Sequence, residues 1–282
     1  MRPFSPRFAQ HRRSILAAAL AAAFLQRTGR AADTVSGTAN VTPEMMNLAA
    51  DLFYGREQER ARAKRTLDMD RDKLAMARRS SRLLIEAAPL ILPAAAGWAW
   101  AVDVETREEP LAYCLPNGKI MLSTGLFDRT RLTADEVAVV IAHSIAHALA
   151  GTDATEAAAR LAEMREAPDP NRRILQLSEI LGKLVLATPH DQATERAIDS
   201  MSLEFMARAG VNPEPAVEAW RKIARAGGAT PPGFLAMHPV WSGRIEEIEA
   251  QIPALLPLYE QARAEQAARP RAPPVRTRSG RF

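Results

Sequence analysis

The chain of 282 residues is poor in cysteine and in long apolar runs. Cys114 is its only cysteine, which excludes an intramolecular disulfide, and no cysteine follows the N-terminal apolar run to carry a lipid. The apolar stretch 83–102 contains a glutamate, two prolines and a glycine, which favours a packed core segment over a membrane span. The composition suits one medium-sized globular domain with appendages.

Basic residues are concentrated at the two ends of the chain. Residues 1–31 carry six arginines and no acid, whereas residues 262–282 carry six arginines and one glutamate. The segment between them is net negative although the whole chain has a formal charge of +4. A nucleic-acid groove needs basic residues on a folded face, so we exclude nucleic acid as a partner. Residues 261–282 are expected to form a solvated, disordered basic tail, with peripheral contact with anionic lipid as the alternative.

The first 31 residues have the pattern of an export signal. Arg12 and Arg13 precede an apolar run at 15–25, and small residues follow around Ala31. The apolar run is shorter than the roughly 17 to 25 residues of a membrane anchor. We therefore expect cleavage near Ala31 and a periplasmic or otherwise exported protein. The paired arginines favour the twin-arginine route, and general secretion remains the alternative.

Helical and extended patterns alternate along the body of the chain. Residues 32–97 read as an N-terminal helical region whose charged side chains form a solvated face. From Trp98 the apolar residues alternate, as in a half-buried strand. The segments 111–115 and 119–124 flank Pro-Asn-Gly and predict a hairpin.

The best-defined helix follows this hairpin. Thr133 and Glu136 form a capping box at its start, and Gly151 suits its C-terminal cap. A variable, polar, proline-containing region comes next. Two further helices are expected, one that begins at Thr188-Pro189 or at Asp191 and runs to Gly210, and one that begins at Asn212-Pro213 and stops at Gly227-Gly228.

Two histidines on the helix that begins at Thr133 have the spacing of metal ligands. His143 and His147 lie four residues apart and therefore share one helix face, where they can bind one zinc ion. In H-E-x-x-H zinc peptidases the residue after the first histidine is a glutamate that moves protons. Here that residue is Ser144, whose hydroxyl hardly ionises at neutral pH. Loss of a general base typically lowers the rate on the order of a hundredfold to ten-thousandfold.

Ser144 also lacks the setting of a nucleophile. The chain has no G-x-S-x-G elbow around it, and neighbouring residues on one helix do not readily present nucleophile and base together. Cys114 is interpreted as a core residue rather than a nucleophile.

Four ordered segments resemble metallopeptidase family forty-eight, a gluzincin group that includes periplasmic zinc peptidases. They cover the sheet segment, the histidine helix, the helix of the third ligand and the terminal H-P segment. In this chain these are AYCLPNGKIMLSTGLFD, DEVAVVIAHSIAHALAG, ERAIDSMSLEFMARAGVNP and FLAMHPVWSGRIEEIEAQIP.

The resemblance implies an α+β fold, a mostly helical zincin-like domain at 98–260 with a small β-sheet. It also implies a third zinc ligand on the helix beginning near residue 191. Matching Asp199 to the aspartate of the family's E-x-E-A-D pattern places Ala197 at the ligand position, which is then vacant. Glu195 lies two residues away, so we expect it to point to another helix face.

A metal site remains open under this alignment. His238 corresponds to the family's histidine near the active site, and it would complete a three-histidine zinc site with His143 and His147. The alternative is that the histidines are packed relics without metal. His190 is interpreted as a solvated residue at a helix start, and His11 is lost with the signal.

The favoured function is that of an exported pseudopeptidase. It would bind unfolded or extended polypeptide, or an envelope protein, in protein quality control without cutting it. The resemblance implies that the strand before the zinc helix receives the polypeptide as an added strand. This strand comprises Lys119, Ile120, Met121, Leu122, Ser123 and Thr124.

Two other functions stay open. One is an active zinc endopeptidase in which other residues supply the missing groups. The other is a structural subunit of an envelope complex. Metal content and cleavage of unfolded protein distinguish the active endopeptidase from the pseudopeptidase. A stable envelope complex that peptide competitors do not disrupt would indicate the structural subunit.

Overall fold

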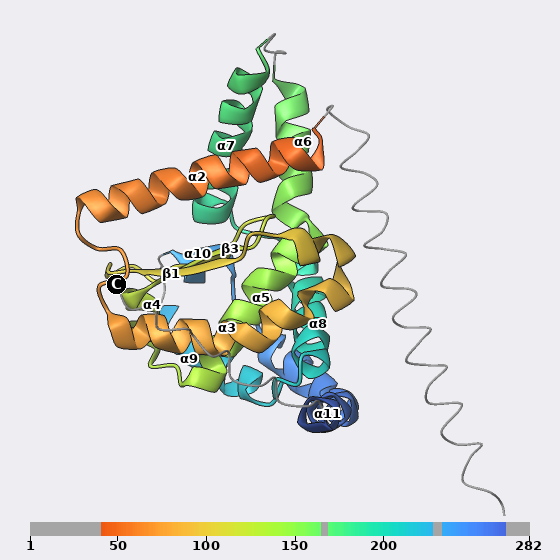
Figure 1. Cartoon of the computed structure of the whole chain (residues 1–282). Coiled ribbons are helices and arrows are strands. Elements are labelled where there is room, and N and C mark those ends of the chain that lie inside the picture. The colour runs from red at the N-terminus through yellow and green to blue at the C-terminus, as the bar shows by residue number, and fades with distance from the viewer. Residues whose placement is uncertain (1–40, 165–168, 228–232, 269–282) are drawn as a thin grey trace, which may run out of the picture.

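The computed structural model describes residues 41–164, 169–227 and 233–268. The expected export signal at 1–31 and the last part of the basic tail lie outside these residues. The fold is mostly helical with one small sheet, as expected for an α+β zincin-like domain. Helices cover the sheet on both faces (Figure 1). Among the described helices none is long and apolar enough to cross a membrane alone, although one bent pair, α5 with α6, passes that test together.

The sheet has three strands in the order β1-β3-β2. β3 pairs in parallel with β1 and antiparallel with β2, so the predicted hairpin is confirmed between β2 and β3. The strand expected from Trp98 begins later, since Trp98 and Trp100 pack against each other ahead of it. The strands are β1 (Ala101–Glu105), β2 (Ala112–Cys114) and β3 (Lys119–Ser123).

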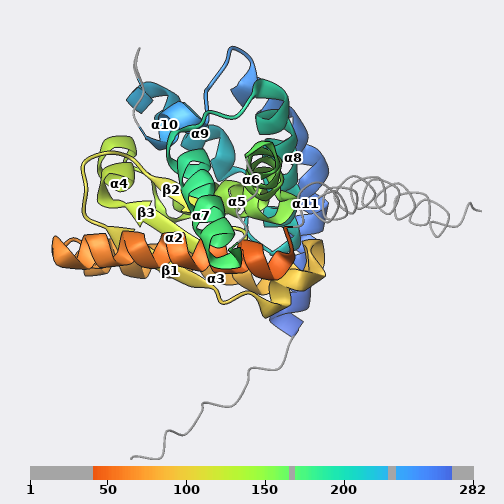
Figure 2. The same cartoon turned by 90° about the horizontal axis from the view of Figure 1, so that it is seen from above.

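The two faces of the sheet contribute to two separate hydrophobic clusters. Alternate residues point to opposite faces, so Ile120 and Leu122 of β3 join the cluster with α3 (Arg71–Ile91) and α5 (Ala134–Ala150). Met121 joins the cluster with α2 (Pro43–Ala63) and α7 (Pro170–Ala187). Figure 2 shows α2 crossing over the sheet beside α7. The sheet is thus a buried middle layer, with α5 packed along β2.

Helix α5 is fixed at both ends, as predicted. Thr133 Oγ1 accepts from the Glu136 amide, the Glu136 carboxylate accepts from the Thr133 amide, and Gly151 caps the C-terminus with a φ of 68°. Lys222 Nζ lies 2.7 Å from the same carboxylate. Nearly every residue of α5 is buried. The capping box therefore sets where the two histidines lie in the centre of the molecule.

Replacing Thr133 with alanine is expected to lower the free energy of unfolding by about 1 kcal/mol. The substitution removes the acceptor of the Glu136 amide and leaves the rest of the helix unchanged. Urea unfolding followed by circular dichroism measures this loss. Thr106→Ala, at an exposed threonine, is the matched control. Equal losses in both variants would contradict the role of the cap.

The region expected to be variable and polar contains two helices. α6 (Thr152–Glu163) follows α5 directly, and α7 packs against both α6 and α2. Leu177, Leu181 and Leu184 of α7 are buried against Phe53 of α2 and its neighbours. Pro170, which we took as a loop signal, instead occupies the first position of α7, where a missing amide proton costs nothing.

The C-terminal part encloses the other side of α5. α8, which packs against α5 and α11, is capped by Asp191, and α9 also packs against α5. α11 continues through Ala268, so residues 261–268 of the expected disordered tail are helical. These helices are α8 (Gln192–Arg208), α9 (Pro215–Gly227), α10 (Phe234–Met237) and α11 (Arg244–Ala268). Shorter elements are the 3-10 helix at Pro93–Gly97 and α4 (Thr124–Thr130).

Candidate metal centre

The two histidines of α5 present their Nε2 atoms to one another, 3.3 Å apart. Both side chains are buried. The carboxylate of Asp199 lies 3.2 Å from His143 Nδ1, and Thr152 Oγ1 lies 3.0 Å from His147 Nδ1. The Thr152 hydroxyl donates to the His147 carbonyl, so it accepts from the histidine ring. His147 therefore carries its proton on Nδ1 and turns its Nε2 lone pair inward, which is the form that binds a metal, while His143 Nδ1 faces Asp199 without forming a hydrogen bond.

Glu195 of α8 supplies the carboxylate that we expected to be missing. Its oxygens lie 3.3 Å from His147 Nε2 and 3.4 Å from His143 Nε2, and the residue is fully buried. Ala197, which we took as the vacant ligand position, is exposed on the opposite side of α8. The expectation was wrong because it took the second glutamate of the E-x-E-A-D pattern as the ligand, whereas Glu195 stands at the first. The useful signal was the four-residue spacing of Glu195 and Asp199, which places both acids on one helix face.

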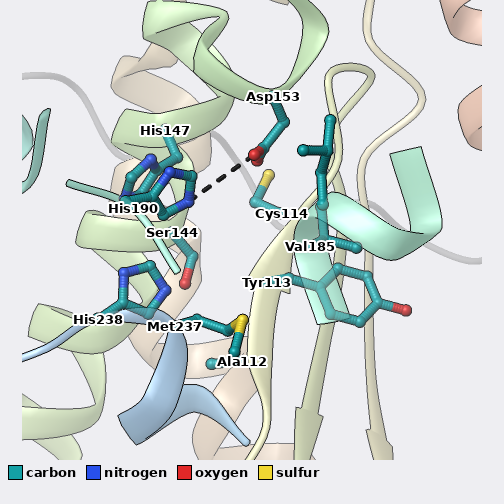
Figure 3. A pocket seen from close by; sticks show the side chains of 11 residues that line it. Ala112, Tyr113, Cys114, Ser144, His147, Asp153, Val185, His190, Met237 and His238 are labelled. Carbon is teal, nitrogen blue, oxygen red and sulfur yellow. Dashed lines mark ion pairs between the residues drawn. The ribbon is translucent and has the colours of Figure 1, made fainter. Parts of the chain in front are cut away.

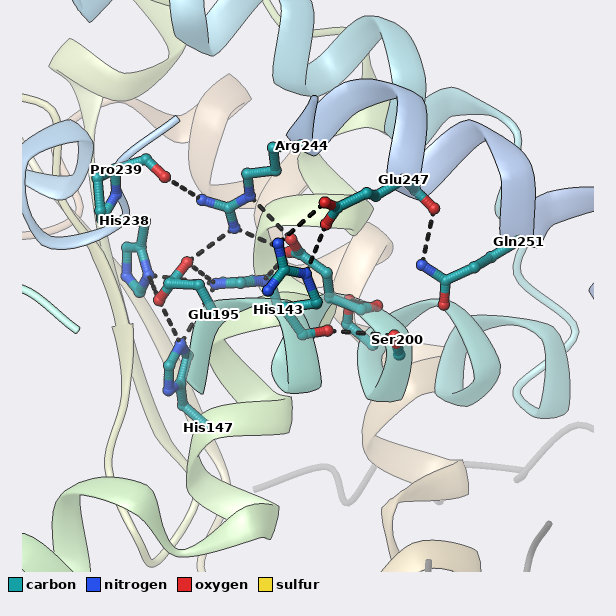
Figure 4. Close-up of polar contacts among 12 residues, drawn as sticks. His143, His147, Glu195, Ser200, His238, Pro239, Arg244, Glu247 and Gln251 are labelled. Carbon is teal, nitrogen blue, oxygen red and sulfur yellow. Dashed lines mark hydrogen bonds and ion pairs between the residues drawn. The ribbon is translucent and has the colours of Figure 1, made fainter. Parts of the chain in front are cut away.

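His238 completes the cluster from the end of α10. Its Nδ1 atom lies 3.2 Å from His143 Nε2 and 2.9 Å from Glu195 Oε1. Figure 4 shows the three histidines converging on Glu195. One ligand atom from each of the four residues falls within 4.8 Å of all the others. The predicted convergence of the three histidines is therefore present, with Glu195 as a fourth member.

The spacing of these atoms fits a tetrahedral zinc ion. Zinc–nitrogen bonds of about 2.0–2.1 Å place the ligand atoms of a tetrahedron about 3.3 Å apart. The nitrogen–nitrogen separations are 3.2 and 3.3 Å. Inward lone pairs and a carboxylate, all buried, form a donor set that a divalent cation satisfies. His143, His147 and Glu195 would hold the ion, with His238 as a possible fourth ligand.

Arg244 ties the carboxylates of this cluster together. Its guanidinium donates to Glu195 Oε2 at 2.7 Å and to both carboxylate oxygens of Asp199 at 2.8 Å. The side chain is fully buried, lies over the ring of Trp220 at 3.7 Å, and also donates to the Pro239 carbonyl. No local pattern indicates this role, because Arg244 contacts residues more than forty positions away in the chain.

The ionisation of the cluster follows from burial and from opposite charges. Burial raises the pKa of Glu195, but His238 and His143 outweigh it and leave that pKa well below its usual range. Burial lowers the pKa of His147 and takes that of His238 down to about 4. For His143 the same effect is exceeded by Glu195 and Asp199, so its pKa is raised. The carboxylate is thus charged and two of the rings are neutral near pH 7, as metal ligands must be.

Ser144 occupies the position of the catalytic glutamate without replacing it. Its Oγ donates to the Val140 carbonyl at 3.0 Å, one helical turn back on α5. The side chain is only 3% exposed. The hydroxyl is therefore engaged with its own helix, and the residue offers no carboxylate.

A small cavity of about 20 Å³ lies between the cluster and β2. Ser144 and His147 line one side, and Ala112, Tyr113 and Cys114 line the other (Figure 3). This volume suits about one water molecule. Cys114 is buried, as expected of a core residue, and burial raises the pKa of its thiol.

The strand that faces the cavity is β2, not the predicted strand 119–124. β3 is the central strand, with β1 on one edge and β2 on the other, so it cannot accept an added strand. Thr124 already belongs to α4. The register, with Leu115 bonded to Lys119, leaves the backbone amides and carbonyls of Ala112 and Cys114 directed away from β3. The prediction of Lys119–Thr124 as the receiving strand was therefore wrong, because strand order is not fixed by order in sequence.

His190 is also part of the site, contrary to the expectation of a solvated residue. Its ring stacks on His147 at a centroid distance of 4.2 Å, and its side chain is 17% exposed. The backbone amide of His190 donates to the Met237 carbonyl, which connects the start of α8 to α10. His190 Nε2 lies 3.7 Å from Asp153 Oδ1 (Figure 3). Sequence reasoning gave Asp153 no role.

Comparison with known proteins agrees with this geometry. The sequence model of peptidase family M48 matches residues 76–252. Metallopeptidases of this family use zinc. Mitochondrial metalloendopeptidase OMA1 of Saccharomyces cerevisiae is 26% identical over 183 residues, which are 59% of this chain and 51% of that protein. OMA1 of Arabidopsis thaliana is 31% identical over 144 residues, 51% of this chain and 30% of that protein. The chain thus spans about half or less of these relatives.

The family match covers more than half of the chain and includes all four residues of the cluster. It confirms the resemblance drawn from the four ordered segments. The chain belongs to peptidase family M48.

Proposed function

We propose that this protein is a zinc-binding member of the family with impaired catalysis, which binds extended segments of unfolded or envelope proteins. The observation that carries the proposal is the contrast between an assembled ligand cluster and a missing base. His143, His147 and Glu195 have the separations of zinc ligands, whereas Ser144 donates to Val140. The site supports metal binding and substrate binding better than it supports rapid hydrolysis.

Zinc, when bound, would polarise a peptide carbonyl beside the cavity. The residues of this chain then do the rest. Thr152 holds His147 in the metal-binding tautomer, Asp199 faces the Nδ1 side of His143, and Arg244 orients the Glu195 carboxylate. Without a carboxylate at Ser144, no residue on α5 takes the proton of the attacking water. This accounts for impaired catalysis with an intact metal centre.

Mature protein purified without a metal-binding tag is expected to contain about one zinc ion per chain. His143→Ala removes a ligand and should abolish this stoichiometry, as measured by elemental analysis after dialysis. His190→Ala is the matched control, since it removes a neighbouring histidine that is not a ligand and should retain the ion. Absence of zinc from the natural chain under saturating supply would contradict the proposal.

The binding mode proposed is addition of a strand to β2. The free backbone groups of Ala112 and Cys114 face the cavity beside the metal cluster, where an extended peptide would reach both. In this structure Leu184, Val185 and Met237 also line that cavity, and they must move for a peptide to enter. These three side chains explain why the edge of β2 is buried in the free protein.

N-methylation of a bound peptide at alternate residues is expected to weaken binding on the order of tenfold or more. Each methyl group removes a donor that the β2 edge would use, and one net hydrogen bond is worth about 1 kcal/mol. Methylation of the intervening residues, whose amides point away, should have little effect. Fluorescence anisotropy with the two methylated peptides distinguishes them, and equal weakening would rule out strand addition.

We also propose that the protein acts in quality control after export. The arginine-containing segment 1–31 supports export, and the binding of extended chains through backbone groups supports a broad range of clients. Fractionation of cells that express the full chain, followed by sequencing of the mature N-terminus, tests the route. Recovery of the intact chain in the cytoplasm would overturn it.

A further inference from the structure

Asp153 lies at the wall between the inner cavity and a larger outer cleft. It lines the cavity that contains Ser144 and His147, and it also lines a cleft of about 490 Å³ between the ends of α5, α6, α7 and α8. His190 and Leu184 line both as well. A cleft of this size is in the range of ligand sites in proteins. A side chain that enters from the cleft would therefore meet Asp153 before it reaches the metal cluster.

The Asp153 carboxylate is buried and incompletely paired. The residue is only 7% exposed, and its Oδ1 atom has no hydrogen-bond partner in the described part of the chain. The ring nitrogen His190 Nε2 stands 3.7 Å from that oxygen, which is too far for a hydrogen bond. Burial raises the pKa of Asp153, and Glu195 adds to that effect. A buried carboxylate oxygen without a donor is costly unless a ligand supplies one.

The lining of the outer cleft carries more acidic than basic side chains. Its lining includes three carboxylates, those of Asp153, Glu156 and Asp191. Arg160 is the only lysine or arginine in the described lining, and its Nε lies 2.7 Å from Glu156 Oε1. The Asp191 carboxylate accepts a hydrogen bond from the Thr194 amide as the N-cap of α8. Asp153 is thus the buried acid of the cleft that keeps an oxygen free.

The apolar neighbours of Asp153 suit the stem of a long side chain. Leu184 lines both cavities, and Val185 lines the inner one. Lysine and arginine carry methylene groups that pack on such surfaces while the charged end reaches a carboxylate. An ammonium or guanidinium donor would also satisfy Oδ1 with a charge-assisted hydrogen bond.

The geometry points to Asp153 as a specificity residue that accepts a lysine or arginine side chain of the polypeptide bound at this site. This assignment deepens the proposed function and rests on it, because the polypeptide must first lie beside β2. The basic side chain would leave the bound strand toward α6 and enter from the outer cleft. Clients would then be selected by a basic residue near the metal cluster rather than by backbone groups alone.

A purely structural role for Asp153 makes a different prediction. The residue lies in the first turn of α6, where an acid stabilises the helix N-terminus. In that role its replacement lowers stability but leaves the relative affinity for different peptides unchanged. Peptide discrimination, and not stability, is therefore the informative readout.

The experiment uses the full mature chain with zinc and three labelled ten-residue peptides of alanine, serine and valine. Their central residue is lysine, Nε-acetyl-lysine or norleucine, so that length is kept while charge is removed. Anisotropy gives the dissociation constant of each. The natural chain should prefer the lysine peptide about tenfold or more, the effect of one hydrogen bond to a charged group. Asp153→Asn should reduce that preference to less than about twofold, with the norleucine peptide bound as before.

Glu156→Gln is the matched control, because it removes an exposed charge from the same cleft and should keep most of the preference. Asp153→Ser provides a second, smaller replacement if the asparagine variant does not fold. Equal discrimination in the natural chain and both Asp153 variants overturns the assignment, as does an absence of any preference for lysine. Failure of all three peptides to bind the natural chain overturns the proposed function itself.

Discussion

Ser144→Glu is expected to raise the rate of peptide hydrolysis by this protein on the order of a hundredfold to ten-thousandfold. The substitution restores a carboxylate one residue after His143, beside a ligand cluster that is already assembled. The cavity next to Ser144 gives the longer side chain a direction in which to extend. Cleavage of a casein-type unfolded substrate, with zinc supplied, measures the gain.

Two variants separate this gain from other effects of the larger side chain. Ser144→Gln has the same size as the glutamate variant but no base, and it should remain as slow as the natural chain. His143→Ala combined with Ser144→Glu should lose the gained activity together with zinc. A folded, zinc-loaded Ser144→Glu protein without cleavage would show that the impairment extends beyond residue 144.

Arg244→Met is expected to lower the free energy of unfolding by about 3–5 kcal/mol. The replacement removes the donor to Glu195 and Asp199 and leaves both carboxylates in the interior without their counter-charge. Urea unfolding in the presence of a chelator measures the loss, since bound zinc would partly compensate for it. Methionine fills a similar volume, so the effect reports charge and hydrogen bonding more than packing.

Arg196→Met is the control for this prediction. Arg196 pairs with Glu247 through two hydrogen bonds, but at the surface, where solvent screens the pair. Its loss should change stability little. Similar losses for both arginines would show that the buried network contributes no more than an exposed ion pair.

The local parts of the site were readable from the sequence. The spacing of His143 and His147 and the capping box at Thr133 depend only on residues within one helix. The β2–β3 hairpin depends on a short turn, and it too was predicted. Such features are determined over a few residues, which is the range over which sequence patterns act directly.

The parts that depend on distant segments were missed or misplaced. β1 pairs in parallel with β3, which makes β3 central, and no local pattern specifies that order. The third ligand position was assigned to Ala197 instead of Glu195, two residues earlier. A difference of two residues rotates a helical position by about 200°. Arg244 contacts Glu195 on another helix, and Asp153 faces His190 from far along the chain. Their roles appear only once the helices are packed together.

The covered edge of β2 has a consequence for how tightly this protein would bind a peptide. Leu184, Val185 and Met237 line the cavity beside this edge, so under the proposed strand addition a peptide would bind only the fraction of molecules in which they have moved aside. The apparent dissociation constant equals the intrinsic value divided by that fraction. If about one molecule in a hundred is open, affinity falls about a hundredfold for every peptide alike. Under the proposed binding mode, the closed resting state therefore sets a threshold of intrinsic affinity that every extended segment must exceed to be held.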